Sequence, residues 1–95
     1  MKRIPQTACG DHLYGELGSG EKSVLLVGHY DTVFPIGSLT GMPFRRADAE
    51  DKIYGPGVMD MKGGIIMAYY AVKALLDLGL FPARTIGVLF NSDEE

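Results

Sequence analysis

The sequence predicts an α/β fold built around one βαβ unit, in which two parallel strands are joined by a right-handed crossover through a helix. Two apolar, β-branched runs, at residues 23–29 and 85–91, are typical of buried strands. Residues 61–78, between them, repeat apolar side chains at helical spacing instead. A chain of 95 residues with 46% hydrophobic content is expected to form one domain with a modest core.

The first half of the chain predicts strands followed by a long loop. Residues 12–17 alternate polar and apolar side chains, and the turn sequence GSGEK follows them. We therefore expect residues 12–17 and 23–29 to form a hairpin whose second strand is buried on both faces. Residues 31–57 are rich in proline, glycine and charge and are predicted to be loop, with a short strand at 52–54.

The crossover helix is predicted over residues 61–78. Its expected buried stripe consists of Ile65, Ala68, Tyr69, Val72, Leu75 and Leu76. Gly79 is a good residue to end the helix, and Pro82 just beyond cannot continue it. Gly63 and Gly64 each cost about 1 kcal/mol relative to alanine in a helix, so we expect something to pack close to the backbone there.

Composition excludes several classes of function. The net charge of −3 and the pI of about 5.3 show no excess of positive charge that would favour binding to nucleic acid or an anionic membrane. Cys9 is the single cysteine, so an intramolecular disulfide is impossible and a reducing compartment fits best. The N-terminus lacks the apolar segment of a signal peptide, and no apolar run approaches the roughly 20 residues of a membrane span. The expected location is the cytoplasm.

Three polar clusters are predicted to meet at one edge of the sheet. His29 and Asp31 end the first parallel strand, Glu94 and Glu95 follow the second, and Asp60 precedes the helix. In open α/β sheets, ligands bind beyond the carboxyl ends of the parallel strands. Each cluster also has a plainer interpretation. The first could be a polar strand end that begins a turn, Asp60 could cap the helix, and the glutamates could be a solvated acidic segment.

Together the clusters favour metal chemistry. Mixed histidine and carboxylate ligation suits zinc, and a bridging carboxylate is typical of sites with two metals about 3.5–4 Å apart. His29 and Asp31 share a face in extended backbone, so the carboxylate can hold the imidazole in one tautomer. In an extended chain Glu94 and Glu95 would point in opposite directions, so one could bind metal while the other handles protons.

Three stretches in this order resemble one family: VLLVGHYDTV, YGPGVMDMKGG and VLFNSDEE. The family is that of the di-zinc metallopeptidases, which includes glutamate carboxypeptidase (carboxypeptidase G type), acetylornithine deacetylase, succinyl-diaminopimelate desuccinylase and aminoacylase. The resemblance runs from about Gly10 to Glu95. The segments GHYDTVFPIG, PFR and GPGVMDMKGG resemble the glutamate carboxypeptidase branch, whereas the deacetylase branch tends to have arginine where this chain has Pro56.

The resemblance implies a role for each site residue. His29 would bind the first zinc and Asp31 would orient its ring. Asp60 would bridge both zinc ions, and the peptide bond after it would be cis. Glu94 would be the general base that activates water and the acid that protonates the leaving amine, and Glu95 would bind the second zinc. The implied cofactor is two Zn²⁺ ions, with Co²⁺ or Mn²⁺ as alternatives. The implied substrate is a small peptide or N-acyl amino acid with a C-terminal glutamate-type amide bond.

The resemblance also implies how these residues belong to a larger protein. Residues 1–95 would be the first part of a zinc-peptidase-like three-layer αβα catalytic domain, without the smaller lid or dimerisation domain and without a further aspartate and histidine ligand. We therefore expect little activity and weak zinc binding from these residues by themselves. The strand at residues 85–90 is expected to leave an edge unpaired, which would favour a homo-oligomer. The alternative functions are a deacylase or dipeptidase of the same family, or a non-catalytic α/β module that self-associates.

Overall fold

The fold is α/β, as predicted, in a computed structural model that describes residues 1–80 and 84–95. Pro82, expected to follow the end of the helix, lies outside the described residues. The strands and helices are β1 (Lys2–Ile4), β2 (His12–Leu17), β3 (Ser23–His29), α1 (Ser38–Gly41), β4 (Arg45–Ala47), β5 (Lys52–Tyr54), α2 (Gly63–Asp77) and β6 (Thr85–Asn91). Short helical turns stand at Asp48–Glu50 and Val58–Lys62, and the second is kinked.

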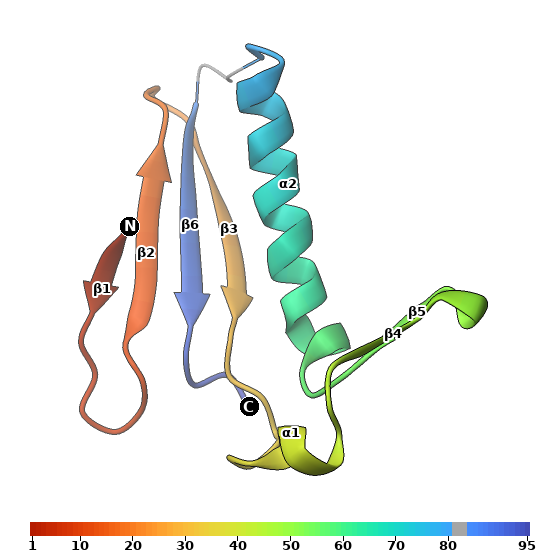
Figure 1. The fold of residues 1–95 in the computed structure, drawn as a ribbon. Helices are drawn as coiled ribbons and strands as arrows, with labels where there is room; N and C mark the ends of the chain where they lie inside the picture. The colour runs from red at the N-terminus through yellow and green to blue at the C-terminus, as the bar shows by residue number, and fades with distance from the viewer. Residues whose placement is uncertain (81–83) are drawn as a thin grey trace.

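The main sheet has the strand order β1-β2-β6-β3. β3 and β6 pair in parallel from Ser23 opposite Thr85 to His29 opposite Asn91, and α2 connects them (Figure 1). The predicted βαβ unit is therefore confirmed. Because the two strands end in register, the segments that follow them leave the sheet at the same edge.

The predicted hairpin of residues 12–17 with 23–29 is wrong. β2 and β3 do not pair, because β6 lies between them, antiparallel to β2 and parallel to β3. The turn sequence connects the two strands but does not decide their partners, since β6 pairs along nearly the whole length of both. The prediction of an unpaired edge on residues 85–90 is wrong for the same reason. Among the described strands, the outer ones are β1 and β3.

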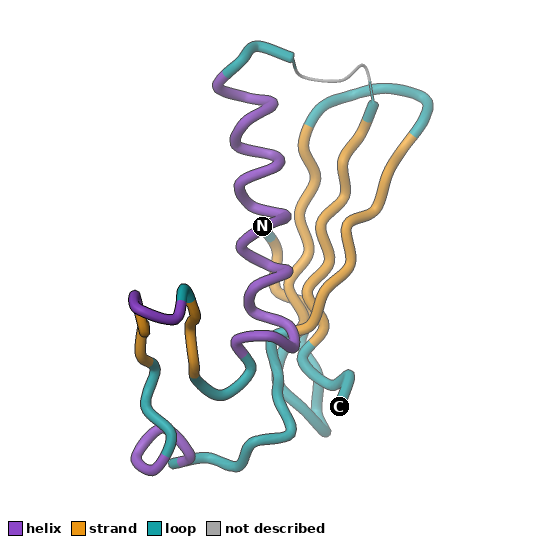
Figure 2. Tube along the Cα trace, turned by 90° about the vertical axis from the view of Figure 1, so that its right-hand side faces the viewer, coloured by secondary structure: helices purple, strands orange, loops and turns teal. Residues whose placement is uncertain are grey.

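The expected burial of β3 on both faces is also wrong. Leu25 is 52% exposed and Val27 is 61% exposed. Figure 2 shows α2 on one side of the sheet, and Leu26, on the face opposite to Leu25, lies toward the helix. In a three-layer fold, further helices would cover the face of Leu25 and Val27. The described residues supply no such layer, so only one face of the strand is covered.

The crossover helix begins at Gly63, two residues later than expected, because the kinked turn occupies Val58–Lys62. Val72 is buried in the predicted stripe, but Tyr69 and Leu76 are 59% and 50% exposed. A hollow of about 680 Å³ separates α2 from the sheet, and both side chains line it. The loose contact between helix and sheet explains why the buried stripe is narrower than the helical period predicts. None of the described helices is long and apolar enough to cross a membrane.

The region predicted as loop contains more order than expected. The short strand at Lys52–Tyr54 is confirmed as β5, and it pairs antiparallel with β4. Together they form an arm that projects away from the sheet (Figure 1). The Arg45 guanidinium lies 4.0 Å from the centre of the Tyr54 ring, which holds the two strands of the arm together by a cation–π contact.

Candidate metal centre

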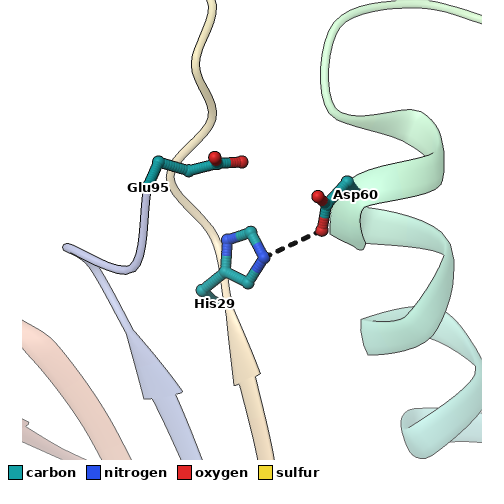
Figure 3. A group of neighbouring side chains, drawn as sticks. All are labelled: His29, Asp60 and Glu95. Carbon is teal, nitrogen blue, oxygen red and sulfur yellow. Dashed lines mark hydrogen bonds and ion pairs between the residues drawn. The ribbon is translucent and has the colours of Figure 1, made fainter.

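Three of the predicted site residues converge at the carboxyl edge of the parallel strands. His29 ends β3, Asp60 lies in the kinked turn before α2, and Glu95 follows β6. One potential ligand atom from each residue lies within 4.8 Å of the other two (Figure 3). The three side chains come from segments far apart in the chain, and the βαβ unit alone brings them together.

His29 is at the centre of the cluster, and the residue is only 6% exposed. Its Nε2 atom lies 3.0 Å from Asp60 Oδ1 and 3.8 Å from Glu94 Oε2, and its Nδ1 atom lies 3.4 Å from Asp31 Oδ1. Burial opposes a charge on the ring. The hydrogen bond with Asp60 and the negative charges of Glu94, Asp60 and Asp31 outweigh this effect and raise the pKa of His29.

Asp31 links the ends of the two parallel strands. Its Oδ2 atom accepts the backbone N–H groups of Glu94, at 2.8 Å, and Glu95, at 3.1 Å. Burial would raise the pKa of this carboxyl group, but these hydrogen bonds and the nearby His29 lower it below its usual value. The sequence predicted the approach of Asp31 to His29. It carried no signal for the link to the glutamates, which lie more than 60 positions away.

Asp60 does not cap the helix, so that interpretation is wrong. The start of α2 has no side-chain cap hydrogen bond, and the Asp60 carboxylate meets the His29 ring instead. The peptide bond between Asp60 and Met61 is cis, as the resemblance implied. The contact with His29 directs the Asp60 side chain to the cluster and not to the free N–H groups of the helix.

The close packing expected at the paired glycines is confirmed. A Cβ atom at Gly64 would lie 2.9 Å from the Met61 methyl carbon, and one at Gly63 would lie 3.0 Å from the Val58 carbonyl oxygen. Met61 also reaches β3, where a Cβ atom at Gly28 would lie 3.3 Å from it. The His29 N–H group donates to Met61 Sδ at 3.3 Å. Met61 thus packs between β3 and α2 and holds the neighbouring Asp60 close to His29.

Ser92 and His12, to which the sequence pattern gave no functional role, anchor the segment after β6. Ser92 is 8% exposed, its N–H group donates to His12 Nδ1 at 3.2 Å, and its hydroxyl group donates to the Gly10 carbonyl oxygen. These contacts attach the residues before Glu94 to the start of β2. The only sequence signal was the polar His12 at the first position of an alternating strand, and its partner could not be inferred from that position.

The donor set fits a divalent cation. His29 supplies a nitrogen ligand, and Asp60 and Glu95 supply oxygen ligands, a mixture that suits zinc. Asp31 and Glu94 add further negative charge within 4 Å of the same imidazole. The positive charge of a bound cation would compensate this excess of negative carboxylates. Because Asp31 lies beside Nδ1 of the His29 ring, Nε2 is the ring nitrogen that faces the other ligands.

Gly57 is the turn residue where a side chain should disturb this site. Its φ is +68°, and an added Cβ atom would meet Thr32 Cγ2, Lys62 Nζ at 2.8 Å and the Asp60 carbonyl oxygen at 3.3 Å. We expect Gly57→Ala to lower the free energy of unfolding by about 1–2 kcal/mol for the left-handed backbone and by about 1–3 kcal/mol more for overpacking. Chemical denaturation measures the loss.

The matched control is Gly79→Ala. Gly79 has a φ of +64°, close to that of Gly57, but an added Cβ atom there would meet no atom of the described residues within 4 Å. This control should show the backbone cost alone. Equal losses for the two variants would contradict close packing around Gly57.

The family model described as "Peptidase family M20/M25/M40" matches residues 25–95. Carboxypeptidase G2 of Pseudomonas sp. (strain RS-16) is 45% identical over 87 residues, which are 90% of this chain and 20% of that protein. Succinyl-diaminopimelate desuccinylase of Orientia tsutsugamushi (strain Ikeda) is 39% identical over 98 aligned positions, covering 100% of this chain and 25% of that protein. Acetylornithine deacetylase of Photorhabdus laumondii is 36% identical over 97 aligned positions, covering 100% of this chain and 24% of that protein.

The chain thus spans about 20–25% of the length of these curated relatives. The matched residues include all three clusters from which the candidate metal centre is built, because the family match begins before His29 and extends to Glu95.

Proposed function

This chain belongs to the peptidase family M20/M25/M40, and on that premise we propose that its protein is a zinc-dependent hydrolase of amide bonds in small peptides or N-acyl amino acids. The observation that carries the proposal is the convergence of His29, Asp60 and Glu95 within 4.8 Å, beside Glu94. A hydrolase of this kind needs metal ligands and a nearby proton acceptor in one place, and this edge of the sheet supplies both.

We propose separate duties for the five residues of the site. His29 and Asp60 would hold one zinc ion and Asp60 and Glu95 would hold a second, so that Asp60 would contribute to both. Asp31 orients the His29 ring through Nδ1, from 3.4 Å away. The same carboxylate fixes the backbone of Glu94 and Glu95, which keeps the two glutamates beside the ring.

Glu94 is proposed as the residue that moves the proton. Zinc, when bound, would polarise the scissile carbonyl group and lower the pKa of the attacking water. The Glu94 carboxylate takes a proton from this water and later gives it to the amine of the leaving group. Its Oε2 atom lies 3.8 Å from His29 Nε2, so it is next to the cluster without being one of the three converging ligands.

The substrate that we favour has a C-terminal glutamate-type amide bond. Two features support this choice: the 45% identity to carboxypeptidase G2, and Pro56 at the position where the deacetylase branch tends to have arginine. Hydrolysis of an N-acyl amino acid or a dipeptide is the second candidate. The similarity to a succinyl-diaminopimelate desuccinylase and to an acetylornithine deacetylase favours it. Comparing hydrolysis of acyl-glutamates, acylornithine and dipeptides decides between the two.

A zinc titration of the wild-type chain and of Glu95→Ala tests the metal centre itself. Loss of a hydrogen-bond partner around a metal ligand costs about 10–100-fold in affinity, and loss of the ligand should cost at least as much. Asp93→Ala is the matched control, because it removes the same charge from the same segment and Asp93 lies outside the cluster. Equal zinc affinity in wild-type and Glu95→Ala would contradict the proposed ligand. It would favour the alternative of a non-catalytic module.

A further inference from the structure

The connection between β1 and β2 lies at the same end of the sheet as the metal centre (Figure 1). Its last part, residues 10–12, contacts both of the segments that carry the site residues, and we call it the bridging segment. Each of its three residues supplies one hydrogen-bond acceptor: the Gly10 carbonyl oxygen, the Asp11 carbonyl oxygen and the Nδ1 atom of His12. None of the duties proposed for the metal centre falls on these residues.

Ser92 attaches the segment after β6 to the bridging segment. Its N–H group donates to His12 Nδ1 at 3.2 Å, and its hydroxyl group donates to the Gly10 carbonyl oxygen. Ser92 is buried, so its N–H group would be left without a partner, at a cost, if the acceptor were removed. A backbone N–H group is always a donor, so Nδ1 of the His12 ring must be unprotonated, and the proton of the neutral ring is on Nε2.

Tyr30 attaches the segment after β3 to the same bridging segment. Its hydroxyl group donates to the Asp11 carbonyl oxygen, and its backbone N–H group donates to the Asn91 carbonyl oxygen at 3.0 Å. An added Cβ atom at Gly10 would lie 3.4 Å from the Tyr30 hydroxyl oxygen and 3.4 Å from Ser92 Cβ. Gly10 therefore lies between these two side chains, and the bridging segment packs against both strand ends at once.

The bridging segment joins the two strand ends close to the site residues. Tyr30 directly follows His29, and Ser92 stands two residues before Glu94. On the other side of the glutamates, Asp31 accepts their backbone N–H groups. The segment after β6 is thus held from two sides, by Asp31 and by the bridging segment. These contacts fix the separation between the imidazole of His29 and the two glutamates.

We propose that His12 is a positioning residue of the metal centre: by accepting the Ser92 N–H group, it holds the two glutamates at the separation from His29 that zinc binding and proton transfer require. This inference rests on the proposed hydrolysis. His12 acts through Ser92, and the required property is an acceptor at the position of Nδ1. Zinc affinity should fall in proportion to the fraction of molecules in which the glutamates are out of place.

His12→Leu and His12→Asn test this role, because they separate hydrogen bonding from packing. Leucine keeps an apolar side chain in β2 but offers no acceptor, whereas the asparagine side-chain oxygen can lie close to the position of Nδ1. We expect His12→Leu to lower the zinc affinity of the chain about two- to tenfold, the equivalent of one net hydrogen bond, and His12→Asn to restore it. A role in packing or strand stability alone predicts the reverse order, because asparagine is the poorer strand residue.

Nuclear magnetic resonance on the zinc-free chain locates the effect. In the wild type, the nitrogen signal of His12 Nδ1 should be that of an unprotonated nitrogen. His12→Leu should speed amide hydrogen exchange at Ser92 and the two glutamates and leave residues 86–90 of β6 at their wild-type rates. Tyr30→Phe should also speed exchange at Ser92, because it releases the bridging segment from the other strand end. Tyr54→Phe, which removes a hydroxyl contact with Glu50 in the β4–β5 arm, is the matched control.

The outcomes separate this inference from the proposed function. If Glu95→Ala weakens zinc binding but His12→Leu binds zinc like the wild type, His12 is not a positioning residue and the metal centre stands. Faster exchange throughout β6 in His12→Leu, or a His12→Asn variant no better than His12→Leu, would also overturn the inference, because the contact would then stabilise only the fold. Faster exchange confined to Ser92 and the glutamates, in a chain that binds no zinc, would support positioning by His12 and contradict the proposed hydrolysis.

Discussion

Glu94→Gln is expected to lower turnover by about 10²–10⁴-fold while zinc affinity stays at the wild-type value. The amide has nearly the shape of the carboxylate, but it cannot accept a proton from water. Glu94 lies beside the His29 ring and outside the three-ligand cluster, so the change should leave the ligand set intact. The backbone N–H group of Glu94 donates the hydrogen bond to Asp31, so the substitution also preserves this contact.

Measuring the turnover of Glu94→Gln requires a complete catalytic domain. Replacing the matched 87-residue segment of carboxypeptidase G2 with the corresponding residues of this chain provides one, since the two are 45% identical there. Turnover of this chimera with and without Glu94→Gln gives the ratio, and zinc content measured on the same samples reports on the metal. Glu21→Gln, in the turn before β3, is the control for the chemical change. A Glu94→Gln chimera that keeps full turnover would remove Glu94 from the proposed proton transfer.

Asp60→Asn should cause the largest loss of metal affinity, exceeding that of Glu95→Ala. Asp60 is the proposed ligand of both ions, so one substitution would weaken two sites, and the neutral amide is a poorer ligand than a carboxylate. The variant also removes the charge that lies 3.0 Å from His29 Nε2, so the pKa of His29 should fall toward its ordinary value.

Zinc titration and the His29 titration curve from nuclear magnetic resonance measure the two effects of Asp60→Asn in the same chain. Asp93→Asn is the matched control, since Asp93 lies outside the cluster. If Asp60→Asn loses no more zinc affinity than Glu95→Ala, this result would argue that Asp60 is not shared between two ions. An unchanged pKa of His29 would argue that the ring and Asp60 do not interact in solution.

The sequence predicted the positions of the site residues better than the architecture of the sheet. His29 and the two glutamates were predicted to meet because parallel strands end at one edge, a rule that depends only on the order strand, helix, strand. The rule holds wherever β6 enters the sheet, provided that β6 runs parallel to β3. The meeting of His29, Asp60 and Glu95 could therefore be predicted without knowledge of the neighbouring strands.

The pairing of β2 could not be predicted in the same way. The turn sequence between β2 and β3 is a local signal, and it indicates a reversal of direction without specifying the partner. The partner is β6, whose pairing with β2 joins Leu17 to Ile86 across most of the chain. The contact of His12 with Ser92 depends on that same pairing, so local patterns could not have indicated it either.

The central position of β6 has a consequence for how the protein is made. During synthesis, β6 emerges after both of its neighbours, so β2 and β3 cannot pair with it until residue 91 has been added. Such non-local pairing is slow, because a long segment must be closed before any contact forms. Since Glu95 follows β6, the set of converging ligands His29, Asp60 and Glu95 would be complete only after this strand has docked. Zinc uptake during synthesis would then report that β6 has inserted into the sheet.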